Sequence, residues 1–195
     1  MIKTVLYNAF AISALLLGLV SNPVQAQTHR IDYEQSKLSF SGTHAGNAFT
    51  GEFGEWSAKI EFFAERPENS AFEATFETKS AKTGKPLYDG TMPQKDWFNS
   101  KEFPEAHFET TKITSDDVAG HYQAEGLLTI RDITQPVSFD FIVSDPNTAP
   151  VRAEASLKLD RLAFGIGAQS DGNADWVSRD IDIVITIMAE PIGGN

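Results

Sequence analysis

Apolar and polar residues alternate one by one over most of this chain, which is the pattern of β-strands that bury one face. The most regular stretch covers residues 122–131, and a second alternating stretch, residues 137–143, follows after a break at Asp132 to Pro136. Two strands joined this closely pair as an antiparallel hairpin. The sequence therefore predicts an antiparallel sheet with one face turned towards a core.

Similar alternation recurs on both sides of this hairpin. It is present in residues 29–42, 49–62, 70–80, 106–111, 151–159 and 176–191. Residues 81–104 break the pattern, and Thr91-Met92-Pro93 is expected to open a short helix that continues through Trp97-Phe98. Strands at this spacing are typical of a sandwich or a barrel. We expect an all-β fold, an eight-stranded antiparallel barrel with a long loop and short helix between strands, because closure removes exposed sheet edges.

The first 26 residues carry the features of a secretory signal peptide. A short basic start precedes an apolar run at Ala9 to Val20, and Val24-Gln25-Ala26 offers small residues for cleavage. The apolar run is short for a bilayer-spanning helix. We therefore expect residues 1–26 to be removed, leaving residues 27–195 as one domain with no integral membrane span.

Composition restricts the chemistry of the protein. The chain has no cysteine, so it has neither disulfides nor a Cys-x-x-Cys-His haem attachment. Its net charge of −11 argues against attraction to nucleic acid or to an anionic membrane surface. The four histidines are scattered and show no metal-ligand spacing, and no Gly-x-Ser-x-Gly elbow is present. These observations predict no covalent cofactor, no metal site and no enzymatic activity.

The predicted inward rows mix large residues with small ones. Phenylalanines and isoleucines alternate with small residues such as Ala74, Ala124, Gly126, Ala153 and Ala155. Small residues facing inward leave room for a ligand, and they are equally expected where a barrel tapers and its own side chains fill it. From the residues alone, a hollow barrel and a filled barrel are both consistent with the sequence.

Several motifs resemble the YceI-like, polyisoprenoid-binding periplasmic proteins. The stretch from Gly126 to Val137, GLLTIRDITQPV, resembles the family's G-x-L-T-I-R-G-V-T-x-P-V. Further matches, in order and spacing, are Phe49-Thr50-Gly51-Glu52-Phe53, Thr83-Gly84 before Asp89, Trp97-Phe98 before Phe103-Pro104 and His107-Phe108, and Phe164-Gly165-Ile166-Gly167. The resemblance spans residues 31–190. This chain departs from the family at Asp132, where Gly is common, and at Thr91, where the family often has a histidine.

The resemblance implies a lipocalin-like barrel whose hydrophobic interior holds an isoprenoid chain, either a polyprenyl lipid or a quinone tail. Together with the signal peptide, it implies a periplasmic location. Under this hypothesis the large inward side chains line the cavity: Phe40, Phe53, Phe72, Phe76, Trp97, Phe98, Phe108, Leu128, Ile130, Phe139, Phe141 and Leu157. Polar candidates for the rim, near a ligand head group, are His44, Asp89, Arg131 and Arg161.

Each of these candidates has a structural alternative. Trp97 and Phe98, with Met92 and Phe103, form either a movable lid or a permanent plug at one end of the barrel, and the plug is favoured because aromatic side chains bury large areas. Arg131 and Asp132, or Arg161, either face a pyrophosphate or quinone oxygen at the rim or form a structural Arg–carboxylate pair that fixes the turn, which is slightly favoured. His44 is either a head-group contact or a solvated loop residue.

Three functions follow from these expectations. The first is a periplasmic carrier or sequestering protein for an isoprenoid, without catalysis. The second is an accessory to membrane electron transfer or stress response, in which a bound quinone is presented to a membrane redox partner. The third, an enzyme acting on an isoprenoid, requires a buried acid or base in the cavity, which the predicted inward rows lack. The sequence does not specify the oligomeric state.

Overall fold

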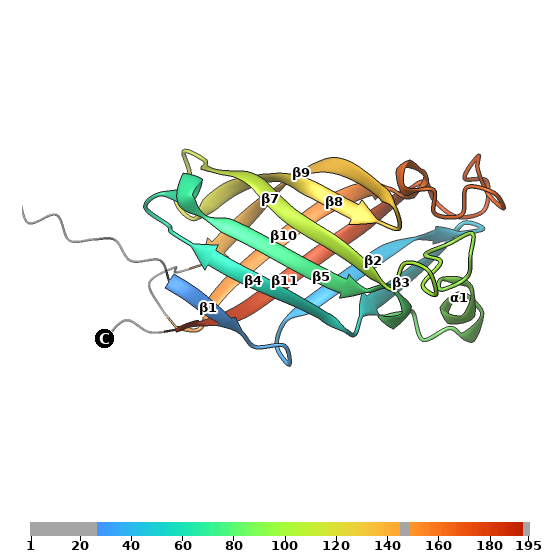
Figure 1. Cartoon of the computed structure of the whole chain (residues 1–195), viewed down its shortest axis with the longest axis horizontal. Coiled ribbons are helices and arrows are strands. Elements are labelled where there is room, and N and C mark those ends of the chain that lie inside the picture. The colour runs from blue at the N-terminus through green and yellow to red at the C-terminus, as the bar shows by residue number, and fades with distance from the viewer. Residues whose placement is uncertain (1–26, 145–148, 193–195) are drawn as a thin grey trace, which may run out of the picture.

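The computed structural model describes residues 27–144 and 149–192, and the predicted signal peptide lies outside this range. The described residues form one antiparallel sheet that curls into a barrel, with its long axis horizontal in Figure 1. Its strands are β1 (Gln27–Ile31), β2 (Lys37–His44), β3 (Asn47–Phe53), β4 (Trp56–Phe62), β5 (Ala71–Glu77), β6 (Ala81–Lys82), β7 (Glu105–Ser115), β8 (His121–Ile130), β9 (Ile133–Ser144), β10 (Val151–Asp160) and β11 (Asp180–Ile192). The helices are α1 (Pro86–Thr91) and the 3-10 turns η1 (Pro67–Asn69), η2 (Thr78–Ser80) and η3 (Arg161–Phe164).

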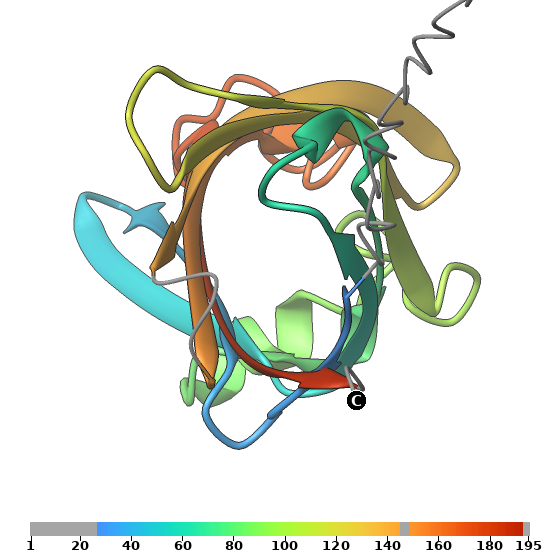
Figure 2. The ribbon, with the colours of Figure 1, turned by 90° about the vertical axis from the view of Figure 1, so that its left-hand side faces the viewer.

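Hydrogen-bonded neighbours close a ring of eight strands. The ring runs β1, β4, β5, β7, β8, β9, β10 and β11, and β11 pairs back with β1. Figure 2 looks into this ring along the barrel axis. β2 pairs with β11 beyond β1, β3 pairs with β2, and β6 pairs with β3, so these three strands extend the wall towards α1. The prediction of an antiparallel all-β barrel is confirmed.

The predicted count of eight strands is corrected to eleven, because three long strands are interrupted. The carboxylate of Asp32 accepts hydrogen bonds from the backbone N–H groups of Glu34 and Gln35, and this turn separates β1 from β2. A bend at Gly54-Glu55 separates β3 from β4, and η2 separates β5 from β6. The sheet continues after each interruption, so the eleven strands form one sheet in which eight strands close the ring.

The predicted central hairpin is present, but its turn is shorter than expected. β9 starts at Ile133 and includes Pro136, which lies opposite Leu127 of β8. β10 pairs with β9 only from Asp140 to Ser144, so Pro136 lies where β9 has a single neighbouring strand. A proline, which lacks an N–H donor, is tolerated at such an edge position.

The helix and the last strand also differ from expectation. α1 ends at Thr91, where the predicted helix was expected to begin, because Pro86 occupies its first turn and favours helix initiation there. Residues 92–103 form successive turns. The last strand starts at Asp180 and not at Trp176, because residues 171–179 form a loop packed on Arg161.

Candidate functional site

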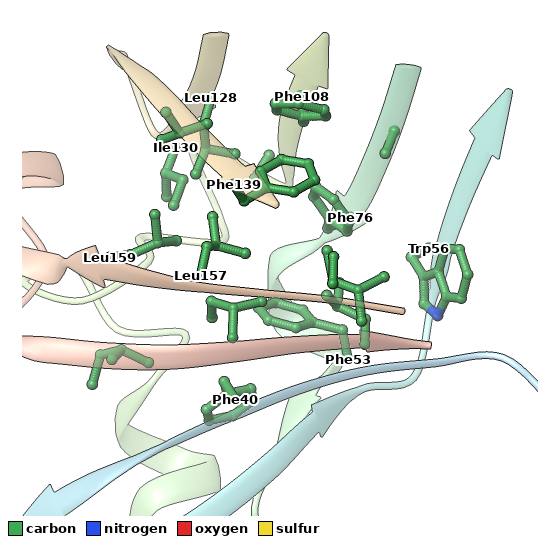
Figure 3. A pocket seen from close by; sticks show the side chains of 18 of the residues that line it. Phe40, Phe53, Trp56, Phe76, Phe108, Leu128, Ile130, Phe139, Leu157 and Leu159 are labelled. Atoms are coloured by element: carbon green, nitrogen blue, oxygen red, sulfur yellow. The ribbon is translucent and has the colours of Figure 1, made fainter. Parts of the chain in front are cut away.

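The inside of the barrel holds a cavity of about 550 Å³. Apolar side chains from all parts of the wall line it, and in Figure 3 Phe108, Leu128, Ile130 and Phe139 point from one side towards Phe40, Phe53, Leu157 and Leu159 on the other. A volume between about 300 and 1,000 Å³ is typical of ligand pockets. The interior of this barrel is therefore hollow, which resolves the choice that the sequence left open.

All twelve residues that the sequence predicted for the lining lie on the cavity wall. Their alternation along each strand turns the apolar row inwards, as the burial of Tyr122, Ala124, Leu128 and Ile130 along β8 illustrates. Whether they contact a ligand stays a prediction.

Some of the small inward residues do not create space. A Cβ atom on Gly51 would lie 2.3 Å from the ring of Phe40, and one on Gly126 would lie 2.5 Å from the ring of Phe108. The two phenylalanine rings thus lie flat over the glycine backbones of the neighbouring strands. Ala74, Ala153 and Ala155, in contrast, border the cavity directly.

The barrel end remote from α1 is closed by packed aromatic side chains. Phe62, Tyr122 and Phe141 contact one another there, with ring centroids 5.1 to 6.2 Å apart. Ile113, Val143 and Val151 complete this buried cluster. Access for a ligand is therefore not expected at this end.

The cavity reaches the protein surface beside α1. Leu87 of α1 lines the cavity and is 71% exposed, so this residue marks the opening. Tyr88 follows it, and the Tyr88 hydroxyl forms a hydrogen bond of 3.1 Å with Nδ1 of His44, at the end of β2. His44 is half-buried and lines the cavity, so it is not the solvated loop histidine that one alternative described. We call this region, formed by His44, Phe49, Leu87, Tyr88 and Met92, the mouth.

The other three rim candidates lie in different settings. Asp89 and Arg131 are not among the residues that line the cavity. The carboxylate of Asp89 accepts hydrogen bonds from the backbone N–H and the hydroxyl of Thr83, which lowers the pKa of Asp89. Arg131, which has a φ of 61°, donates from Nη1 to the carbonyl of Gly165 at 2.7 Å. Asp89 thus holds a local turn, and Arg131 joins the β8–β9 turn to the segment after η3 through a backbone carbonyl and not through the carboxylate pair that its alternative described.

Arg161 reaches the cavity wall but its donors are engaged elsewhere. It is 3% exposed and forms an ion pair of 2.7 Å with Asp171, which is 7% exposed. Its remaining N–H groups donate to the carbonyls of Ile166, Val177 and Ser178. The structural Arg–carboxylate pair is therefore the arrangement observed here.

Trp97 and Phe98 close the barrel above the cavity in a fixed position. The guanidinium of Arg161 lies 5.6 Å from the Trp97 ring centroid. The neighbouring Asp96 accepts hydrogen bonds from the backbone N–H groups of Gln169 and Ser170, both at 2.9 Å. These contacts join residues 92–103 to the loop after η3, which favours the plug over a freely movable lid. Phe103, the fourth residue of the expected lid, does not line the cavity.

The wall of the barrel is incomplete between β4 and the β1–β2 turn. In the described pairing, β1 reaches only Glu61 and Phe62 of β4, so Trp56 to Ile60 have a strand neighbour on one side only, in β5. The hydroxyl of Tyr33 takes the place of a neighbouring strand there, because it accepts a hydrogen bond of 3.3 Å from the Ala58 N–H. The Tyr33 and Trp56 rings meet edge to face, 5.0 Å apart. These two aromatic side chains cover the interruption, and Trp56 also lines the cavity (Figure 3).

Sequence reasoning missed Trp56, His29 and Leu87. Trp56 continues the inward row of Ala58, Ile60 and Phe62 by one more step, so the same alternation contained the signal. His29 is buried and lines the cavity from β1, where it precedes Ile31 by two residues. Leu87 lies in an irregular segment where periodicity gives no information.

Within residues 27–144 and 149–192, no group of three or more His, Asp or Glu side chains is placed to hold a metal ion. None of the helices in that same part of the chain has the length and hydropathy needed to cross a membrane.

The chain is similar in sequence to curated proteins of several bacteria. It is 30% identical to a UPF0312 protein of Pseudomonas fluorescens (strain Pf-5) over 136 residues, which cover 65% of this chain and 69% of the relative. It is 28% identical to the UPF0312 protein plu2095 of Photorhabdus laumondii over 195 residues, covering 96% and 97% of the two chains.

Solved structures share the fold. The crystal structure of Burkholderia cenocepacia BcnA matches with a TM-score of 0.76 at 24% identity, covering 82% of this chain and 99% of that one. A polyisoprenoid binding domain from Saccharophagus degradans, described as implicated in plant cell wall breakdown, matches with a TM-score of 0.64 at 13% identity, covering 86% and 99%. The model of the YceI-like domain matches residues 29–189, almost the whole barrel. The chain therefore belongs to the YceI-like family.

Proposed function

We propose that this protein binds an isoprenoid chain in the barrel cavity and acts as a carrier or sequestering protein in the periplasm. The observation that carries the proposal is the cavity of about 550 Å³, which is lined almost throughout by aliphatic and aromatic side chains and opens at Leu87. Membership of the YceI-like family and the fold shared with a polyisoprenoid binding domain support the same ligand class. The periplasmic location rests on the predicted signal peptide.

The energetics favour a long apolar guest. Burial gains about 0.8 kcal/mol per CH₂, so one five-carbon isoprene unit contributes roughly 4 kcal/mol before ordering costs. Practical binding free energies level off at about −18 to −21 kcal/mol. A few isoprene units already approach this limit, so burial of the tail can hold the ligand through purification. The tail therefore provides the affinity, and the mouth provides the selectivity.

The polar groups at the mouth favour an uncharged head group. His44 and Tyr88 offer an imidazole nitrogen and a hydroxyl, which can exchange hydrogen bonds with a carbonyl or alcohol. Arg161, whose side chain lines the cavity, has its donors satisfied by Asp171 and by backbone carbonyls. A head group that lies inside the cavity lining, against His44 and Tyr88, is therefore better matched by a quinone or a prenol than by a prenyl pyrophosphate.

Native and denaturing mass spectra of the purified protein test the proposal. We expect a mass that accompanies the folded protein and leaves on unfolding, and that fragments as a polyprenyl or quinone species. An empty protein that also takes up no added isoprenoid would contradict the proposal. A redox-active guest would support the further role of presenting a quinone to a membrane redox partner, whereas a polyprenyl alcohol would argue against that role.

A further inference from the structure

Half of the ten lysines of this acidic chain lie in one segment, residues 79–101, which the carboxylates of Glu77, Glu102 and Glu105 flank. Residues 79–101 contain five lysines and only two carboxylates, giving this segment a net charge of +3 in a chain whose net charge is −11. The five residues, which we call the cap lysines, are Lys79, Lys82, Lys85, Lys95 and Lys101, and all five are exposed. Their segment lies at the α1 end of the barrel, in green in Figure 1.

Among the described residues, the cap lysines differ from the lysines of the barrel wall, which form ion pairs. Lys37, Lys59, Lys112 and Lys158, which lie on the barrel wall, each pair with a carboxylate within 4.0 Å. In the part of the chain that the structure describes, no cap lysine has such a pair. The two carboxylates of the segment, Asp89 and Asp96, are occupied by backbone and hydroxyl donors. Lys85 lies over the ring of Tyr88, 5.2 Å from its centroid, and Lys82 contributes to the lowered pKa of Asp89. All five cap lysines are exposed, so they can still reach an external anionic surface.

Exposed apolar side chains lie at the same end. Leu87, at the mouth, is 71% exposed, and Trp176 is 63% exposed. The carbonyl of Trp176 accepts a hydrogen bond from the N–H of Ala45, the residue after His44, so both side chains belong to the end that carries the mouth. Leu87 follows Lys85 by two residues, whereas Trp176 follows the exposed Asp175. An exposed leucine close to basic residues, with a tryptophan at the same end, is a combination that inserts into the headgroup region of a bilayer.

We propose that the α1 end of the barrel docks on the surface of an anionic lipid bilayer, with the cap lysines facing the phosphates and Leu87 inserted beside the mouth. The inference deepens the proposed function and rests on it, since a bilayer is where an isoprenoid chain is taken up or delivered. The net charge of −11 argued against attraction to an anionic membrane surface. An acidic protein can nevertheless bind such a surface through one region in which its basic residues lie together. Each lysine close to such a surface adds roughly 1 kcal/mol.

Co-sedimentation with lipid vesicles tests the docking. The purified protein is mixed with vesicles of phosphatidylcholine alone and of phosphatidylcholine with phosphatidylglycerol, neither of which contains an isoprenoid. We expect binding to the mixed vesicles only, and its loss at about 1 M salt, where the screening length falls to about 3 Å. Absence of binding to the mixed vesicles at low salt would overturn the proposal, as would capture of only nucleic acid or acidic proteins in parallel assays.

Two triple variants that have the same net charge distinguish an effect of the cap lysines from an effect of the overall charge. In K82Q/K85Q/K95Q we expect vesicle binding to weaken at least about tenfold. In the matched control K59Q/K112Q/K158Q, which removes three lysines from the barrel wall, we expect binding like that of the unmodified protein. Equal weakening in both variants would overturn the assignment to the α1 end.

The proposed membrane docking and the proposed isoprenoid binding can be tested separately. Loading of the cavity is measured in detergent solution, without vesicles, by the native mass spectra described above. A protein that carries an isoprenoid but does not sediment with mixed vesicles overturns the docking alone. A protein that sediments with those vesicles but carries and accepts no isoprenoid overturns the proposed cargo and keeps the docking.

Discussion

At the scale of single residues, Arg161 and Asp171 form the ion pair that holds the loop after η3 at the α1 end of the barrel. Both are buried, and the Asp171 carboxylate also accepts hydrogen bonds from the N–H groups of Asp175, Trp176 and Val177. The pair thereby fixes the loop that carries Trp176 and supports the ring of Trp97. A buried charge that loses its partner is costly, because the remaining charge stays out of water.

We therefore expect Asp171→Ala to lower the free energy of unfolding by about 3–5 kcal/mol. Urea denaturation followed by circular dichroism measures the change. The exposed pair of Arg152 and Glu154 provides the control, because Glu154→Ala removes a surface ion pair, which contributes at most about 1 kcal/mol. Similar decreases in the free energy of unfolding for the two substitutions would contradict the larger contribution expected of the buried Arg161–Asp171 pair.

The same carboxylate predicts how stability depends on pH. Burial alone would raise the pKa of Asp171, but its hydrogen bonds with Val177, Trp176 and Asp175 and the charge of Arg161 outweigh burial and lower it. Its stabilising effect is therefore complete above the ordinary aspartate pKa of about 3.9 and is lost as the pH falls through the lower native pKa. Asp171→Asn should flatten the decline in stability below about pH 4, measured by the same denaturation series.

At the scale of elements, the wall between β4 and the β1–β2 turn lacks the strand pairing that joins the other neighbours in the described ring. The contacts that close it are one hydrogen bond from Ala58 to Tyr33 and the edge-to-face contact of Tyr33 with Trp56. An isolated aromatic pair contributes about 0.5–1.5 kcal/mol. Opening at this place therefore needs little energy compared with separating two paired strands.

We expect Trp56→Ala to speed the release of a bound ligand by about two- to tenfold, the equivalent of losing one aromatic pair. A quinone bound in the cavity quenches Trp97, so the recovery of Trp97 fluorescence after dilution into empty vesicles reports the release rate. Trp176→Ala is the matched control, because it removes a tryptophan that does not line the cavity. Equal release rates in the two variants would contradict a role for the β4 interruption.

Regular strands were predictable from the sequence, and irregular segments were not. The inward rows of β8, β9 and β11 follow directly from alternation, because each strand has one buried face. α1 was misplaced because six residues between two prolines carry no helical period. The roles of Arg161 and Asp171 depend on a loop that folds back on η3, and no spacing rule connects an arginine to an aspartate ten residues later.

At the scale of the whole molecule, a closed barrel provides two separate surfaces. The inner surface is almost entirely apolar, and it forms a cavity that is packed shut at one end and open at the mouth. The chain as a whole is acidic, and the cap lysines lie together in the segment at the α1 end. Under the two proposals made above, an apolar chain moves between a bilayer and the interior of the barrel.

The central claim is that the ligand lies inside the barrel, and a substitution that fills the cavity tests it. Ala155 borders the cavity, whereas Ser156, the next residue of β10, is exposed on the outside. Ala155→Phe should therefore occupy the space of the ligand, and Ser156→Phe should leave it free. Because the added ring enters empty space, we expect the Ala155→Phe protein to remain folded.

The most direct measurement is a titration of the delipidated protein with an isoprenoid quinone, followed by quenching of Trp56 and Trp97, which both line the cavity. We expect saturable quenching with one ligand per protein in the unmodified chain and in Ser156→Phe, and affinity at least about tenfold weaker in Ala155→Phe, the loss of about 1.4 kcal/mol. Equal affinity in the two phenylalanine variants, with both proteins folded, would contradict binding inside the barrel.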